Sequence, residues 1–171
     1  MGASHIQIRR LAATDAAIYR DIRLDALRRH PEAFGSTFEA ECGKPLPFFE
    51  GRLSASGVFG AFDHVELVGV AGLLIHEGAK ECHKGFLWGM YVRPAARKIG
   101  VGRRLVAAVV EFARPRVELI HLTVVSENES ARRLYASLGF LEYGIERKAL
   151  KQAGRYYDEV LMAKDFAAES N

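Results

Sequence analysis

Near the start of the chain, apolar residues first alternate with polar ones and then recur at helical spacing. Ile6 and Ile8 alternate with polar neighbours, which predicts a short strand. The apolar positions between residues 18 and 27 recur at near-helical spacing and predict a helix. Thr14 or Asp15 is placed to cap the start of that helix.

The stretch Glu32–Leu46 breaks the pattern. It holds two glycines and a proline, and it predicts a loop that leads to a short helix. Loops of this length are uncommon in compact domains and are often functional.

The rest of the chain alternates between strand-like and helix-like segments. A turn at 63–64 joins the first two strands as a hairpin, and a turn at 152–154 joins the last two. The expected elements are strands Gly57–Asp63, Glu66–His76 and Lys84–Arg93, helix Gly100–Arg114, strand Glu118–Val125, helix Ser130–Leu138, and strands Phe140–Lys148 and Arg155–Lys164.

This order of elements predicts an α/β fold in one domain that spans residues 1–171. Antiparallel strands followed by a strand–helix–strand crossover give a mixed sheet flanked by helices. Ligands of such sheets tend to lie beyond the carboxyl ends of strands, where neighbouring strands diverge. We therefore expect a ligand beyond the end of Lys84–Arg93.

Composition narrows the class of protein. Hydrophobic residues make up 49% of the 171 residues, enough for a sizeable core. No apolar run approaches the ~20 residues that span a bilayer, and residues 1–15 lack the apolar stretch of a secretory signal. We expect a cytoplasmic protein with no membrane partner. Cys42 and Cys82 have no metal-ligand spacing, so we expect two reduced thiols and no metal.

The net charge of +3 is too small to indicate a nucleic-acid partner. Five basic residues nevertheless fall within twelve positions: Arg93, Arg97, Lys98, Arg103 and Arg104. Pro94 ends a strand, Arg97 and Lys98 follow, and Gly100 and Gly102 open a helix. A helix N-terminus offers unpaired N–H groups, glycines let the backbone approach a phosphate, and cations add charge-assisted bonds. This chemistry suits a pyrophosphate; a solvated helix face is the alternative.

Two other phosphate loops do not fit. A Walker loop needs Lys-Ser/Thr after its last glycine, whereas Arg103 and Arg104 follow Gly102. The dinucleotide fingerprint needs three glycines, and only Gly100 and Gly102 are present.

The run Arg97-Lys98-Ile99-Gly100-Val101-Gly102 resembles the Arg/Gln-x-x-Gly-x-Gly/Ala pattern of the GNAT superfamily of acyl-CoA N-acyltransferases. A second landmark of that family matches downstream: Asn128, Ala131, Leu134-Tyr135 and Leu138-Gly139-Phe140. The resemblance covers about Lys84 to Phe140. It implies a mostly antiparallel sheet of six or seven strands, about four flanking helices, and splayed fourth and fifth strands with a bulge on the fourth.

The resemblance also implies acetyl-CoA as cosubstrate and a role for each matching position. Val92 would bond the pantetheine arm through its backbone, and the amide of Met90 would face the thioester carbonyl. Asn128, Ala131 and Leu134 would contact the arm. Tyr135 would be the general acid that protonates the departing thiolate. The residues implied in holding the pyrophosphate are Arg97, Lys98, Ile99, Gly100, Val101, Gly102 and Arg103.

The general base stays open at this stage. Relatives use a glutamate on strand four or five, but the corresponding positions are 86–88 and Thr123, none of which is a base at neutral pH. Glu39 and Glu41 on the long loop, His76, or a water chain are the alternatives.

The implied reaction is direct attack of an amine on the thioester, with no covalent enzyme intermediate. The acceptor is expected to be a small-molecule amine, with a protein N-terminus or lysine as the alternative. Segments Glu32–Phe49 and Leu150–Tyr157 would set that choice, and a homodimer is a family-level expectation. A non-catalytic acyl-CoA-binding module is the competing interpretation.

Overall fold

The computed structural model describes residues 5–167. Residues 1–4, which are part of the segment examined for a secretory signal, lie outside the described part. The strands are β1 (Ile6–Arg10), β2 (Gly57–Asp63), β3 (Glu66–Ile75), β4 (Lys84–Val92), β5 (Leu119–Val125), β6 (Leu141–Gln152) and β7 (Arg155–Asp165). The helices are α1 (Ala16–Arg29), α2 (Phe38–Cys42), α3 (Leu46–Ala55), α4 (Val101–Ala113) and α5 (Glu129–Ser137), with short 3-10 turns η1 (Ala13–Asp15), η2 (Pro31–Ala33) and η3 (Pro94–Ala96).

One seven-stranded sheet runs in the order β1-β2-β3-β4-β5-β7-β6. Every neighbouring pair is antiparallel except β4 and β5, which are parallel. The connection between these two strands is α4, as a parallel pair requires. The predicted α/β fold with a mostly antiparallel sheet is confirmed.

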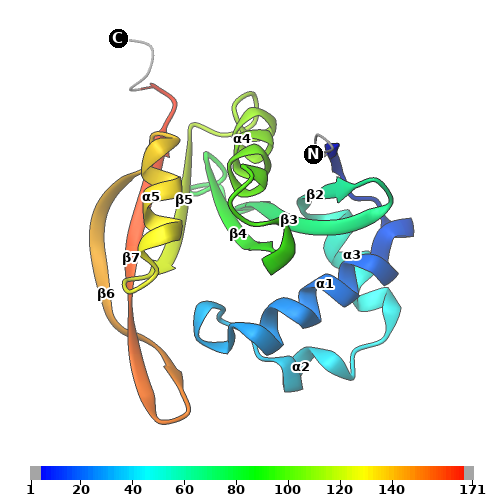
Figure 1. Ribbon diagram of the computed structural model, residues 1–171. Helices are drawn as coiled ribbons and strands as arrows, with labels where there is room; N and C mark the ends of the chain where they lie inside the picture. Colours follow the sequence, from blue (N-terminus) through cyan, green and yellow to red (C-terminus); the bar gives the residue numbers. More distant parts are fainter. Residues whose placement is uncertain (1–4, 168–171) are drawn as a thin grey trace.

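Helices cover both faces of the sheet (Figure 1). On one face α4 and α5 bury a core that includes Leu105, Val109 and Met162. On the other face α1 and α3 bury a second core around Ile22 and Phe49. The sheet therefore separates two apolar layers, and residues that alternate along one strand belong to different layers.

Three details differ from the sequence prediction. The segment expected as a loop from Glu32 holds η2 and α2 before α3, so there are five α-helices in the described chain. The last hairpin is longer than expected, because β6 continues to Gln152. Asp15 precedes α1, but its carboxylate bonds Arg9 and the Ala12 amide instead of a helix amide.

Candidate active site

The parallel strands β4 and β5 separate soon after they start. Only Lys84–Phe86 pair with Leu119–His121, and no pairing continues toward the carboxyl ends of the two strands. On the other side of β4, Tyr91 pairs with Val70 and Trp88 with Gly72. Two β4 residues therefore face one β3 residue, which is a β-bulge. The predicted splay and bulge are both confirmed.

Gly89 makes this bulge, and the sequence analysis did not single it out. Its φ is +63°, a left-handed conformation that side-chain-bearing residues rarely adopt. A glycine in the middle of a β-prone run is the signal that could have located it.

The bulge leaves Val92 with its backbone turned toward the gap. The Arg93 amide donates to the Val68 carbonyl at 2.8 Å, so the adjacent pair of Val92 and Gly69 is the non-hydrogen-bonded pair of the ladder. The N–H and C=O of Val92 accordingly point toward β5. The carbonyl accepts a bond from Arg97 Nε at 2.9 Å, and the N–H lies toward the splay.

The turn between β4 and α4 is rich in unpaired amides. Within residues 5–167, the amides from Lys98 to Arg103 donate no hydrogen bond of normal geometry to the protein. The first amide after them that does so is that of Arg104, which donates to the Gly100 carbonyl at 3.1 Å. Lys98 (φ +66°) and Gly100 (φ +84°) are both left-handed, which turns successive N–H groups toward one side. With the positive end of α4 behind it, this turn is built to bind an anion.

The Arg97 side chain does not join these amides in this structure. Its amide donates to the Pro94 carbonyl, its Nε bonds Val92, and its Nη2 lies 3.0 Å from His30 Nε2. Arg97 therefore braces the start of the turn against β4 and the end of α1. The expected contact of its guanidinium with pyrophosphate stays a prediction that requires the side chain to reorient.

Gly102 is a glycine because of protein packing as well as ligand approach. A Cβ at this position would lie 2.8 Å from Met90 Cε, 3.3 Å from Leu134 Cδ2 and 3.8 Å from Val92 Cγ2. The structure thus brings Met90, Val92, Gly102 and Leu134 together around the opening between β4, α4 and α5. These are four of the positions expected to hold the cosubstrate.

Asn128 begins α5 and caps it. Its Oδ1 accepts a hydrogen bond from the Ala131 amide at 3.2 Å, the usual role of asparagine at a helix start. The side-chain oxygen is therefore engaged within the protein, and the expected contact of Asn128 with the pantetheine arm stays a prediction. Ala131 and Leu134 are partly buried against the core on the α4–α5 face.

Tyr135 lies on α5 with its ring in the same core. The ring is 6% exposed and packs edge-on against Phe140, with centroids 5.8 Å apart. Burial raises the pKa of Tyr135 above the ordinary value of a phenol, so the hydroxyl stays protonated at neutral pH. The hydroxyl makes no hydrogen bond to the described protein, and it is not among the fully enclosed polar atoms without a partner.

Glu41 is not available as a base, contrary to one alternative from the sequence. It is 3% exposed, and its carboxylate is bonded by Arg23 at 2.9 and 3.1 Å and by Arg52 at 3.0 Å. Burial on its own would raise the pKa of Glu41, but the hydrogen bonds and charges of the two arginines outweigh it and hold the pKa at about 2. Glu41 ties α2 to α1 and α3.

His76 is also misplaced for that role. It follows β3 and bonds the backbone of Lys84, at the amino end of β4, and its Nε2 lies 2.9 Å from His121 Nε2. Met90 is six residues further along β4, about 20 Å away at ~3.3 Å per residue. Glu39 is exposed on α2, away from the bonded cluster around Glu41. Phe49 is fully buried in the second core, and Phe34 and Phe48 pack against that core.

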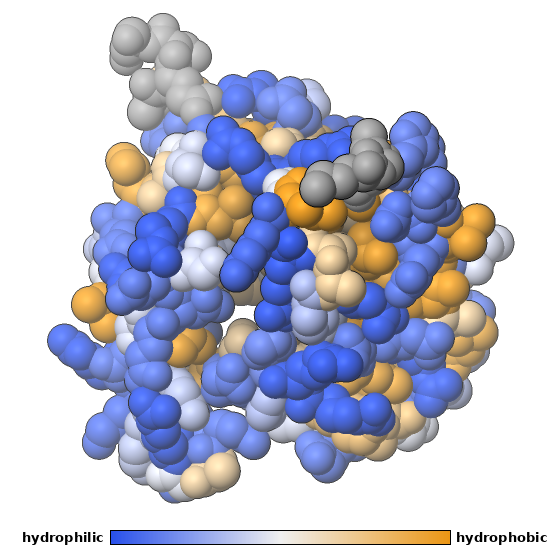
Figure 2. Space-filling model, viewed as in Figure 1, coloured by the Kyte–Doolittle hydropathy of each residue, from blue (hydrophilic) through white to orange (hydrophobic). Residues whose placement is uncertain are grey.

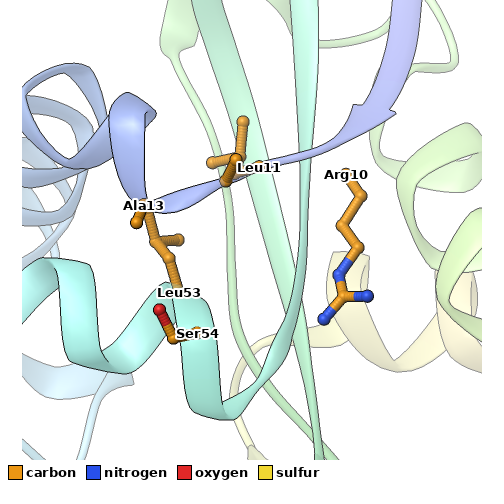
Figure 3. Close-up of a pocket in the computed structure, with 6 residues that line it drawn as sticks. Arg10, Leu11, Ala13, Leu53 and Ser54 are labelled. Atoms are coloured by element: carbon orange, nitrogen blue, oxygen red, sulfur yellow. The ribbon is translucent and has the colours of Figure 1, made fainter.

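The space around the splay is visible on the surface. Figure 2 shows a hollow between the part of the molecule that carries α5, β6 and β7 and the part that carries α1 and α4, with hydrophilic residues around it. A different, shallow pocket of about 320 Å³ lies where β1 meets α3, lined by Leu11, Ala13, Leu53 and Ser54 among others (Figure 3). Its nearest charged group, Arg10, lies over the Phe112 ring at 5.1 Å, so this pocket carries no catalytic chemistry.

Two general findings concern metals and membranes. In the described residues, no group of three or more His, Cys, Asp or Glu side chains is arranged to hold a metal ion. No helix between residues 5 and 167 has the length and apolar character needed to cross a bilayer. Cys42 and Cys82 are free thiols.

Comparison with known proteins places this geometry in context. A model of the acetyltransferase (GNAT) family matches residues 17–140. Aminoglycoside N(6')-acetyltransferase type 1 of Klebsiella aerogenes is 30% identical over 142 residues, which cover 79% of this chain and 89% of that protein. N-alpha-acetyltransferase RimI of Mycobacterium tuberculosis is 36% identical over 74 residues, or 43% of this chain, and the match spans 44% of that protein's length.

Solved structures agree on the fold. An acetyltransferase of the GNAT family from Streptococcus pneumoniae superposes with a TM-score of 0.84 at 20% identity, covering 95% of this chain and 100% of that one. A putative acetyltransferase from Salmonella typhimurium, solved with its cofactor acetyl-CoA, gives 0.78 at 22% identity and covers 94% and 93%.

Proposed function

The chain belongs to the acetyltransferase (GNAT) family, and we propose that it transfers the acetyl group of acetyl-CoA to a primary amine by direct attack on the thioester. The observation that carries this proposal is the set of unpaired amides from Lys98 to Arg103, which opens beside the splay of β4 and β5. The amides of the β4–α4 turn can bind the diphosphate of coenzyme A. The free backbone groups at the edge of β4 can bind the amides of its pantetheine arm.

Each neighbouring residue has a proposed task. The amides of the β4–α4 turn hold the pyrophosphate, with the charge of Lys98 beside them. The N–H of Val92 bonds the pantetheine arm, while Met90 and Leu134 give it an apolar lining. The backbone amide of Met90, which lies in the bulge, stabilises the negative charge that develops on the thioester oxygen.

Tyr135 is proposed as the general acid. The attack expels a thiolate, which needs a proton to leave as a thiol. A phenol whose raised pKa keeps it protonated holds that proton ready at neutral pH. The amine nitrogen loses a proton as the amide forms. That proton passes to the Tyr135 phenolate, so the phenol is restored and the protons balance.

The acceptor is proposed to be a small-molecule amine. The relative whose match extends over 89% of its length is an aminoglycoside acetyltransferase, which supports this class. The partial match to an N-alpha-acetyltransferase supports a protein N-terminus as the second candidate. A non-catalytic acyl-CoA-binding module is favoured only by the absence of a titratable side chain at residues 86–88 and at Thr123.

The test is thiol release from acetyl-CoA with a panel of kanamycin, spermidine, tyramine and a hexapeptide that begins with alanine. We expect acceptor-dependent release with at least one of them, and calorimetric binding of coenzyme A without any acceptor. Failure to bind coenzyme A would contradict the cradle assignment. Binding without turnover on any amine would favour the non-catalytic module.

Tyr135→Phe is expected to lower kcat by about 10²–10⁴-fold while the affinity for coenzyme A changes less than about twofold. Phenylalanine keeps the edge-on packing against Phe140, so the fold is preserved. Steady-state kinetics and calorimetry measure the two quantities. Tyr143→Phe, at a tyrosine that is 60% exposed, is the matched control and should leave both unchanged. Equal kcat in Tyr135→Phe and the wild type would remove Tyr135 from the mechanism.

A further inference from the structure

Glu159 on β7 is a half-buried carboxylate without a cationic partner. Two other buried or half-buried carboxylates near this sheet are neutralised by arginine: Asp25 by Arg29 and Glu41 by Arg23. Within residues 5–167, no lysine, arginine or histidine forms an ion pair with Glu159. An unpaired carboxylate that is partly withdrawn from water is costly unless a ligand uses it.

The register of the sheet places Glu159 beside the splay. It pairs with Val125, the last residue of β5. The final pair of β4 and β5 is Phe86 with His121, and continuing that parallel register past the bulge brings Met90 to the level of Val124 and Val125. Glu159 is therefore one strand beyond the gap, at the height of the amide proposed to face the thioester.

Glu159 also faces the side of the sheet opposite to the cosubstrate cradle. Its neighbours Val160 and Met162 point into the core under α4 and α5, so Glu159, which alternates with them, points to the other face. Thr123 on β5 shares that face, diagonal to Glu159, and its hydroxyl lowers the pKa of the Glu159 carboxyl.

The charges around Glu159 favour a proton-accepting role. Burial raises the pKa of Glu159 above the ordinary value, the Thr123 hydrogen bond opposes this, and the charge of Glu146 raises it further. Glu146 lies directly opposite on β6, Tyr157 lies two residues away on the same face of β7, and η2, which contacts β5 and β6, carries Glu32. None of these is a cation. Arg23 lies at the bulge, with Nη1 3.8 Å from a Cβ built on Gly89, but its charge is paired with Glu41.

On this basis we infer that Glu159 is the general base of the proposed reaction: its carboxylate takes the proton of the acceptor ammonium before attack. The inference rests on the proposed acetyl transfer. First, an N–H bond of the ammonium breaks and its proton passes to Glu159. The neutral amine then forms the N–C bond to the thioester carbon. The C–S bond breaks, and Tyr135 protonates the departing sulfur. The second proton leaving the nitrogen restores Tyr135, and Glu159 releases its proton to water. The base function that relatives place on strand four or five is thus supplied here from β7.

The test is the pH profile of kcat/KM for Glu159→Gln with the panel amine that the wild type acetylates fastest. At pH 7 we expect a loss of about 10²–10³-fold, because the variant reacts only with the small fraction of amine that is already neutral. As the pH rises toward the pKa of the acceptor amine, the deficit should shrink to less than about threefold. Calorimetric affinity for coenzyme A should be unchanged.

Glu146→Gln is the matched variant on the facing strand. It should keep turnover at pH 7 within about twofold of the wild type and move the acid limb of the profile to lower pH, since removing a negative neighbour lowers the pKa of Glu159. A deficit of Glu159→Gln that is constant from pH 6 to 10, or equal to that of Glu146→Gln, would overturn the inference. A wild type that binds coenzyme A but acetylates none of the panel would overturn the proposed function itself, and with it the reaction that Glu159 is inferred to serve.

Discussion

Gly102→Glu is expected to weaken coenzyme A binding by at least about 100-fold. The new carboxylate stands at the first turn of α4, among the amides proposed to hold a diphosphate, and like charges at such a distance cost several kcal/mol. The Cβ also enters the space between Met90, Leu134 and Val92. Isothermal titration of coenzyme A into wild type and variant measures the change.

Two companion variants separate the effect of the new negative charge from the effect of added side-chain volume and from that of a glutamate elsewhere on a helix. Gly102→Ala adds only the Cβ, 2.8 Å from Met90 Cε, and the end of a methionine moves readily, so a loss below about tenfold is expected. Gly51→Glu places the same side chain on α3, where nothing lies within 4 Å of a Cβ, and affinity should not change. Unchanged affinity in Gly102→Glu would refute the pyrophosphate assignment.

Glu41→Gln is expected to lower the free energy of unfolding by about 3–5 kcal/mol. The substitution leaves Arg23, whose side chain is 8% exposed, buried without its counter-charge, and it removes the shared acceptor of Arg52. In a domain of this size such a loss lowers Tm by about 6–20 °C. Urea unfolding and calorimetry measure both quantities.

Glu39→Gln, at an exposed position two residues away on α2, is the control and should change stability by less than about 0.5 kcal/mol.

The stabilising effect of Glu41 has a defined pH window. Because its folded pKa is about 2 against an ordinary 4.5, its stabilisation is complete above pH 4.5 and is lost as the pH falls toward 2. The gap between wild type and Glu41→Gln should narrow over that range. A gap that widens on acidification, or equal losses in both variants, would contradict this role.

The sequence predicted the elements that form the proposed cosubstrate side because its signals are local. A proline ends β4, a glycine with positive φ begins α4, and an asparagine caps α5, and each acts on the backbone within a few residues. The bulge was expected as a family feature, but its residue, Gly89, was recognisable only as a glycine within a strand pattern.

The acceptor side could not be located in the same way, because it depends on distant pairings. Glu41 appeared to be a free loop carboxylate, whereas its partners Arg23 and Arg52 are 18 and 11 residues away in sequence. Glu159 adjoins the splay only because β7 inserts between β5 and β6, an arrangement that no local pattern encodes. His76 could be only one of several alternatives, because the antiparallel β3–β4 register that carries it to the amino end of β4 is not visible in the sequence.

The separation of the two apolar layers has an evolutionary consequence. Tyr135, Leu134 and Met90 belong to the layer under α4 and α5, while Trp88, Tyr91 and Phe49 belong to the layer under α1 and α3. Substitutions in layers that share few contacts act almost independently on stability. Substitutions in the layer under α1 and α3 could thus change the proposed acceptor amine during evolution. The layer under α4 and α5, which is proposed to hold acetyl-CoA, could stay unchanged.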